Sequence, residues 1–255
     1  MSQWVLLRGL MREGRHWGDF PITLQEALPE ATVSLLDLPG NGQLHAMQSP
    51  KRVEQMAEFC HSEMRARGIA PPYHLLALSL GAMVATAWAE RFPDEIAGCV
   101  LINTSLRPFS PFYRRLRPRN YRDLLAIVLA GNDATLKEHL IYQLTSSLPP
   151  DAERIEKWVR FRRDCPVSNR NALRQLVAAI RYRAPIDRPL KSLLILSSAK
   201  DGLVESTCSH TLARHWNVPL CVHPMAGHDL PLDDGPWVAR QVRDWLRSSE
   251  QHVSL

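Results

Sequence analysis

Short apolar runs alternate with longer amphipathic stretches near both ends of the chain. In the longer stretches apolar residues recur three and four positions apart, as on one face of a helix. Six runs are expected to be strands: Val5–Leu7, Val33–Leu36, Leu75–Leu78, Cys99–Ile102, Leu193–Leu196 and Leu220–His223. The helical stretches are Trp17–Leu28, Val53–Met64, Gly81–Arg91, Ser206–Trp216 and Trp237–Leu246. This alternation predicts an α/β fold, with a mostly parallel sheet of about six strands covered on both faces.

The middle of the chain breaks this alternation and shows no convincing strand. Its helical patterns are Tyr121–Leu129, Thr135–Leu144, Ala152–Arg163 and Asn171–Tyr182. We therefore predict a core of residues 1–103 and 189–255, and a helical cap of residues 104–188 over the carboxyl ends of the strands. The apolar sides of the first two cap helices are expected to be buried. They consist of Leu124, Leu125, Val128 and Leu129, and of Leu136, Leu140 and Leu144.

Composition excludes several classes of protein. The chain has 255 residues, of which 45% are hydrophobic and 22% charged, and no apolar run approaches the roughly 20 residues that span a bilayer. The N-terminus resembles a first strand and no signal peptide is expected. Five scattered cysteines, an odd number, favour reduced thiols in a cytoplasmic protein. C-x-x-C and H-E-x-x-H spacings are absent, so neither a metal nor another cofactor is predicted.

The net charge of +5 is unevenly distributed along the chain. Residues 104–188 contain 17 Lys and Arg against 8 Asp and Glu, whereas the remainder contains 14 against 18. No basic helix with interleaved aromatic residues is present, so the pattern favours an arginine-rich surface over a nucleic-acid-binding module. A solvated helical face and a docking surface for an acidic partner are both open.

Ser79 follows an apolar run and directly precedes a helical stretch. A serine at such a strand-to-helix turn has its hydroxyl exposed above the sheet. The turn is tight, so the residues two before and two after it must be small, and here they are Ala77 and Gly81. The segment matches G-x-S-x-G with alanine at the first position, which predicts that Ser79 is a nucleophile and not a helix-capping residue.

A serine nucleophile requires a base, and the base requires an orienting acid. Asp201 lies just past one predicted strand and His228 lies in the loop after the last, in the chain order Ser, Asp, His. Of the nine other histidines, His223 falls within a predicted strand, and His210 and His215 fall on a predicted helix. Asp229, Asp233 and Asp234 are close in sequence, but Asp229 should point away from its neighbour, and the other two suit the N-cap of the last helix.

An oxyanion hole needs two backbone N–H groups near the nucleophile. The residue after the nucleophile, Leu80, should supply one of them. The loop Leu7-Arg-Gly-Leu-Met11 should supply the other, with Leu10 as the expected donor because Gly9 lets the backbone turn closely.

These segments, together with Asp37-Leu-Pro-Gly-Asn-Gly42, resemble the α/β-hydrolase superfamily from Leu6 to Leu246. The resemblance implies that Asp37 is a turn residue. Two features depart from the family: Arg8-Gly9 replaces the usual His-Gly, and the leading antiparallel hairpin is expected to be missing.

Within that family, a serine nucleophile argues against the dehalogenases and epoxide hydrolases, which use aspartate. We expect a serine esterase that cleaves carboxylic esters through an acyl-serine. Hydrolysis of thioesters or of acyl esters on a carrier protein is the first alternative, and a non-catalytic binding protein is the second. The basic cap resembles that of pimeloyl-carrier-protein methyl ester esterases, which implies an acidic acyl carrier protein as a possible partner.

Overall fold

A single sheet forms the centre of the computed structural model, which describes residues 2–251. Its strands are β1 Ser2–Leu7, β2 Ala31–Leu36, β3 Tyr73–Leu78, β4 Ile96–Ile102, β5 Leu193–Ser198 and β6 Leu220–His223. They are ordered β2-β1-β3-β4-β5-β6, and every neighbouring pair is parallel. All six predicted strands are present, and the predicted fold class is confirmed.

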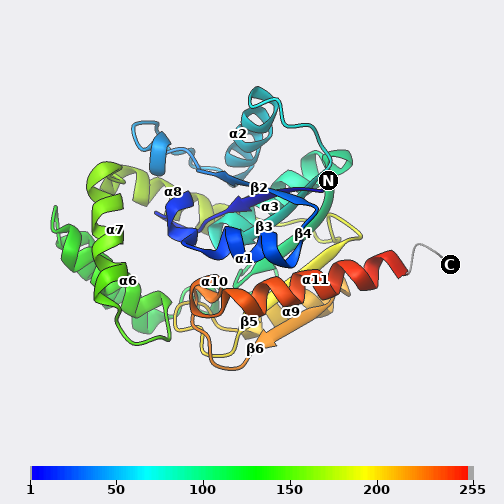
Figure 1. Cartoon of the computed structure of the whole chain (residues 1–255). Helices are drawn as coiled ribbons and strands as arrows, with labels where there is room; N and C mark the ends of the chain where they lie inside the picture. The colour runs from blue at the N-terminus through cyan, green and yellow to red at the C-terminus, as the bar shows by residue number, and fades with distance from the viewer. Residues whose placement is uncertain (1, 252–255) are drawn as a thin grey trace.

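Successive strand residues pack on opposite faces of the sheet, because side chains alternate along a strand. Val5 and Leu7 share one apolar cluster with α2, α3 and α9, whereas Trp4 and Leu6 share another with α1 and α11 (Figure 1). These helices are α1 Phe20–Ala27, α2 Val53–Ala66, α3 Leu80–Arg91, α9 Thr207–Trp216 and α11 Gly235–Gln251. Both faces of the sheet are thus covered, as a parallel sheet requires.

Between β4 and β5 the chain forms helices, and we call residues 104–188 the insertion. Its helices are α4 Phe112–Arg115, α5 Tyr121–Leu129, α6 Ala134–Thr145, α7 Ala152–Asp164 and α8 Asn169–Arg181. The short helices α4 and α10 (Leu230–Asp233) were not predicted. Short 3-10 helices occur at Gly14–Trp17, Gly42–Leu44, Pro93–Glu95 and Pro118–Asn120.

The insertion lies toward the carboxyl ends of the strands. Figure 1 shows α6 and α7 on the side of the molecule opposite the N-terminus, and therefore opposite the start of β1. Ile127 of α5 and Ile141 of α6 line the same cavity as Ser79, at the carboxyl end of β3. The insertion thus contributes walls to the space above Ser79.

The predicted buried side of α5 was wrong. Leu125, Val128 and Leu129 are exposed, the last of them by 74%, and Ile127 is the buried residue of the helix. Leu124 lines the cavity beside Ser79. The helix therefore contacts the rest of the protein along a narrow line through Leu124 and Ile127, and the apolar residues beside that line face solvent.

The interior side of α6 is partly polar, which the apolar pattern could not indicate. Leu136 is exposed, whereas Glu138 is buried. The Glu138 carboxylate accepts hydrogen bonds from Arg12, in the loop after β1, and from Arg162 of α7. A buried carboxylate needs such partners, so these two arginines fix which side of α6 faces inward.

No helix within residues 2–251 combines the length and apolar character needed to cross a membrane. The five cysteines are free thiols, and all but Cys221 are buried. The cytoplasmic location stays a prediction.

Candidate active site

Ser79 occupies a sharp turn between the last residue of β3 and the first residue of α3. Its backbone has φ 57° and ψ −115°, a strained combination for a residue with a side chain. Ala77 is fully buried, and a Cβ atom on Gly81 would collide with the carbonyl oxygens of Leu7 and Arg8. The small residues on both sides of Ser79 are therefore required by close packing against the end of β1.

The His228 imidazole is held by a carboxylate. Its Nδ1 atom lies 2.8 Å from Oδ2 of Asp201, and both side chains are almost completely buried. Oδ1 of Asp201 accepts the backbone N–H groups of Leu203 at 2.8 Å and Val204 at 2.9 Å. These two bonds orient the carboxylate, and the carboxylate orients the ring.

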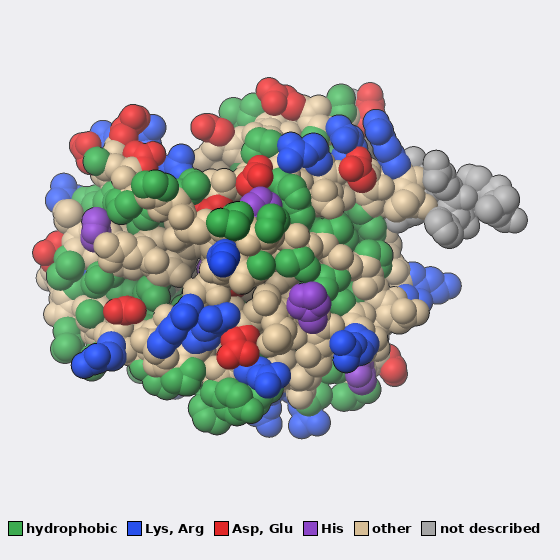
Figure 2. Space-filling view, turned by 90° about the horizontal axis from the view of Figure 1, so that it is seen from below, with side chains coloured by type: hydrophobic (Ala, Val, Ile, Leu, Met, Phe, Trp, Pro, Cys, Tyr) green, Lys and Arg blue, Asp and Glu red, His purple; other side chains and the backbone are tan. Residues whose placement is uncertain are grey.

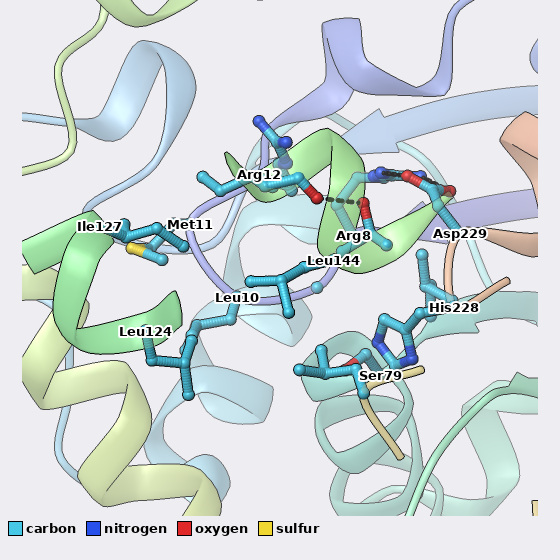
Figure 3. A pocket seen from close by; sticks show the side chains of 15 residues that line it. Arg8, Leu10, Met11, Arg12, Ser79, Leu124, Ile127, Leu144, His228 and Asp229 are labelled. Atoms are coloured by element: carbon cyan, nitrogen blue, oxygen red, sulfur yellow. Dashed lines mark hydrogen bonds and ion pairs between the residues drawn. The ribbon is translucent and has the colours of Figure 1, made fainter. Parts of the chain in front are cut away.

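Ser79 and His228 line the same small cavity, and Figure 3 shows the serine beside the imidazole. Because Nδ1 faces Asp201, Nε2 is the ring nitrogen available on the other side of the ring. The structure thus brings together the three residues that the sequence analysis predicted for the site. Ser79 comes from the turn after β3, Asp201 from the loop after β5 and His228 from the loop after β6.

The protonation of His228 reflects two opposing effects. Burial lowers its pKa, because a buried imidazolium loses its hydration. The charge of Asp201 and its hydrogen bond raise the pKa more, and the net shift is upward from the usual value of 6.5. The pair therefore favours proton uptake at Nε2, which a base beside a serine must perform.

The loop after β1 packs directly against the nucleophile turn. A Cβ atom on Gly9 would lie 3.2 Å from Cβ of Ser79. The N–H of Met11 donates to Oε1 of Gln175 in α8 at 3.0 Å, which fixes the loop. Within residues 2–251, the N–H groups of Leu10 and Leu80 make no hydrogen bond, so both are available to an added oxygen.

Arg8 stands where the resemblance leads one to expect histidine. It anchors this loop to the loop that carries His228. Its guanidinium pairs with both carboxylate oxygens of Asp229, with an Nη1–Oδ1 distance of 3.0 Å, and both side chains are buried (Figure 3). The guanidinium also lies 4.8 Å from the ring centre of Trp17. Asp229 therefore points toward Arg8, and Asp201 is the carboxylate in contact with the imidazole.

Asn103 supports the site and was missed by sequence reasoning. It follows β4, and its Nδ2 atom donates to the His228 carbonyl at 2.8 Å and to Oγ of Ser198 at 2.9 Å. Its Oδ1 atom accepts the N–H of Ser198 at 2.8 Å. The available signal was a polar residue directly after a buried strand, at the edge of the sheet where the other site residues lie.

The predicted N-cap role holds for Asp234 and is wrong for Asp233. Oδ1 of Asp234 accepts the N–H of Trp237 in the first turn of α11, at 2.9 Å. Asp233 instead lies in α10 and accepts the N–H groups of Gly227 at 2.7 Å and Ser147 at 2.9 Å. Asp233 therefore connects the loop that carries His228 to the insertion.

Two cavities of very different size meet at Ser79. The smaller one has a volume of about 80 Å³ and also contacts His228. The larger one has a volume of about 610 Å³ and contacts Leu80 and Met83 of α3. The larger volume lies in the range of ordinary small-molecule sites. A ligand bound at Ser79 can therefore extend in two directions with unequal room.

A buried polar cluster joins the core to the insertion beside the smaller cavity. Arg12 contacts Glu138 of α6, Nε2 of His16 at 3.0 Å, and the Trp158 ring of α7, whose centre is 4.3 Å away. Glu138 also accepts from Arg162. These contacts hold α6 and α7 against the loop that carries Leu10.

Within the part of the chain that the structure describes, no three His, Cys, Asp or Glu side chains are grouped so as to hold a metal ion.

Comparison with known proteins assigns the chain to a family. A pimeloyl-[acyl-carrier protein] methyl ester esterase from Chromobacterium violaceum is 31% identical over 103 residues, which are 40% of this chain and 37% of that protein. An esterase structure from Thermogutta terrifontis matches with a TM-score of 0.75 and 22% identity, covering 97% of this chain and 90% of that one. A 2-hydroxy-6-oxo-6-phenylhexa-2,4-dienoate hydrolase structure from Rhodococcus sp. strain RHA1 matches with a TM-score of 0.76 and 20% identity, covering 96% and 90%.

These two structures share the fold of this chain. Their sequence identities, 22% and 20%, show the fold alone and not a substrate. The model of the Alpha/beta hydrolase family matches residues 4–241, a span that contains the sheet except the first two residues of β1, together with Ser79, Asp201 and His228. The chain belongs to the alpha/beta hydrolase family.

Proposed function

We propose that the protein hydrolyses carboxylic esters through an acyl-serine intermediate. The observation that carries the proposal is the 2.8 Å contact between Asp201 and His228, with the imidazole and Ser79 lining one cavity. Ser79 is the nucleophile, His228 the general base and Asp201 the acid that orients it. The free thiols are compatible with the cytoplasm as its location.

In the proposed reaction Nε2 of His228 takes the Ser79 hydroxyl proton as Oγ attacks the ester carbonyl. The Asp201 carboxylate stabilises the imidazolium that forms. The N–H groups of Leu10 and Leu80 bind the oxyanion. His228 then donates its proton to the leaving alcohol oxygen, and a water molecule, activated by the same base, releases the acid from Ser79.

The cavity sizes suggest how an ester lies in the site. The leaving oxygen must receive its proton from His228, so the alcohol belongs in the cavity that His228 lines. That cavity has a volume of about 80 Å³, against about 610 Å³ for the other. We infer a small alcohol group in the smaller cavity, with the acyl chain in the larger one.

Labelling with a fluorophosphonate probe tests this assignment and separates an enzyme from a non-catalytic binding protein. The wild-type protein should react at Ser79, and Ser79→Ala should abolish labelling. Ser105→Ala is the matched control, because Ser105 lines the large cavity without a neighbouring histidine base. Labelling that persists in Ser79→Ala would overturn the proposal.

A carrier-protein-bound acyl ester or a thioester is the second candidate substrate. Two observations favour the carrier-bound form: the excess of arginine and lysine in residues 104–188, and the partial match to a pimeloyl-[acyl-carrier protein] methyl ester esterase. Arg160 and Arg163 on α7 are exposed and could meet an acidic partner. Arg162, from the same sequence cluster, is paired with buried Glu138 and is not available for docking.

A further inference from the structure

Three arginines line the large cavity beside Ser79. Arg107 lies in the segment after β4, Arg115 in α4 and Arg183 just after α8. Arg107 and Arg183 form an isolated parallel backbone bridge, so the two ends of the insertion meet here. Figure 2 shows the face of the molecule seen from below, with a group of Lys and Arg side chains near the middle of its lower half and others spread toward its edges.

These arginines lack carboxylate partners. Within residues 2–251 no Asp or Glu oxygen lies within the 4.0 Å ion-pair distance of Arg107, Arg115 or Arg183, and no acidic residue lines the cavity. The adjacent Arg114 differs, because its Nε atom lies 3.5 Å from Glu205. The three arginines that line the cavity are therefore without a neutralising carboxylate, whereas Arg114 beside the cavity has one in Glu205.

Arg115 is the most constrained of the three. Its Nη2 atom donates to the carbonyl of Ala179 at 2.7 Å, and its buried Nε has no hydrogen-bond partner. Burial lowers the pKa of the guanidinium, and the charge of Arg107 lowers it further. Holding like charges together in a partly buried place costs free energy, and an anion bound among them would recover it.

The remaining cavity wall is largely apolar. It includes Met83, Leu116, Leu176 and Ile180, and it reaches Ser79. A ligand that matches this surface has an aliphatic segment joined to the ester and an anionic group at the far end. The apolar segment would displace water from the wall, while the anion would accept hydrogen bonds from the guanidinium groups.

We propose that the large cavity binds acyl chains that end in a carboxylate, so that the preferred substrates are monoesters of aliphatic dicarboxylic acids. This inference rests on the proposed ester hydrolysis and assigns Arg107, Arg115 and Arg183 as the subsite for the distal carboxylate. It concerns recognition within the cavity and is independent of a carrier protein docking on α7.

The test compares kcat/KM for monomethyl esters of C4 to C8 dicarboxylic acids with kcat/KM for methyl alkanoates of matched chain length. We expect the wild type to prefer the charged ester at the best length by about tenfold or more, the usual effect of a hydrogen bond to a charged group. Arg107→Gln with Arg183→Gln should bring this ratio toward one. Both side chains are exposed, so the variant should fold.

Arg114→Gln is the control, since it removes one positive charge at a position of α4 that does not line the cavity, and it should keep the wild-type ratio. The free dicarboxylates should also inhibit the wild type competitively, and inhibit the double variant less. Equal kcat/KM for charged and neutral esters, with Ser79 still labelled by fluorophosphonate, would overturn the subsite alone. Absence of both ester turnover and Ser79 labelling would overturn the proposed function.

Discussion

The sheet core and the insertion bury different kinds of side chain. In the core, alternate strand residues such as Val5 and Leu6 pack into two apolar clusters on opposite faces. In the insertion, Glu138 and Gln175 are buried, while Leu129 is exposed. The difference follows from what each region contacts: the core packs helices on a sheet, whereas the insertion packs on loops whose backbone and arginines need polar partners.

The comparison also assigns different tasks to the two regions. The core supplies Ser79, Asp201 and His228 from turns and loops at the ends of its strands. The insertion supplies Gln175, which binds the backbone of the loop carrying Leu10, and apolar residues that wall the smaller cavity. The core should therefore govern the chemical step. The insertion should govern the stability of the site and the choice of substrate.

The largest expected effect is in the core. Ser79→Ala should lower kcat for ester hydrolysis by roughly 10⁴- to 10⁶-fold with the fold retained, and His228→Ala should match it, because the two residues act as a unit. Steady-state kinetics on p-nitrophenyl esters, with circular dichroism as the folding control, measures this. Turnover close to wild type in Ser79→Ala would remove Ser79 from the mechanism.

Asp201→Asn should cost less than Ser79→Ala, at about 10⁴-fold in kcat. It should also alter the pH profile. The base must be neutral, so wild-type kcat/KM should rise with pH through a midpoint above 6.5, because Asp201 raises the pKa of His228. Without that charge burial dominates, the pKa falls, and the acid limb should move to lower pH.

Asp229→Asn distinguishes the two neighbouring carboxylates. Because Asp229 pairs with Arg8, its loss should disturb the loops and have a smaller effect on kcat than Asp201→Asn. A large loss of kcat confined to Asp229→Asn would identify Asp229 as the acid.

Glu138→Gln tests the polar interior of the insertion. It would leave the buried charges of Arg12 and Arg162 without their carboxylate, and breaking a buried pair in this way typically costs about 3–5 kcal/mol. Urea unfolding should show this loss, while Glu156→Gln, at an exposed position of α7, should change stability little. Equal stability of the two variants would mean that the cluster contributes no net free energy.

Much of the fold and the candidate site could be predicted because each rests on a local pattern. Apolar runs predicted the six strands, and the small residues around Ser79 predicted a turn whose φ is 57°. The partners of Glu138 could not be predicted, because Arg12 and Glu138 are 126 positions apart and only the fold brings them together. Arg8 was noticed as an exception, but its pairing with Asp229 joins positions that are 221 residues apart in the sequence.

The smallest expected effect concerns the exposed surface of the insertion. If Arg160 and Arg163 help to dock an acidic carrier protein, a carrier-bound ester should be hydrolysed several-fold faster than the same free ester. This advantage should shrink as salt rises, because surface charges are screened over about 10 Å at 0.1 M ionic strength. Arg160→Glu with Arg163→Glu should remove the advantage and spare p-nitrophenyl acetate, which is too small to reach α7 from Ser79.

The matched control for this variant is Arg240→Glu with Arg247→Glu. It makes the same charge change at exposed positions of α11, a helix that runs away from α7 toward its C-terminal end (Figure 1). If both variants lose the advantage equally, net charge and not a local docking surface steers the partner. If bound and free esters are hydrolysed at equal rates at low and high salt, Arg160 and Arg163 belong to a solvated helical face. The basic character of the insertion would then act only inside the cavity, through Arg107, Arg115 and Arg183.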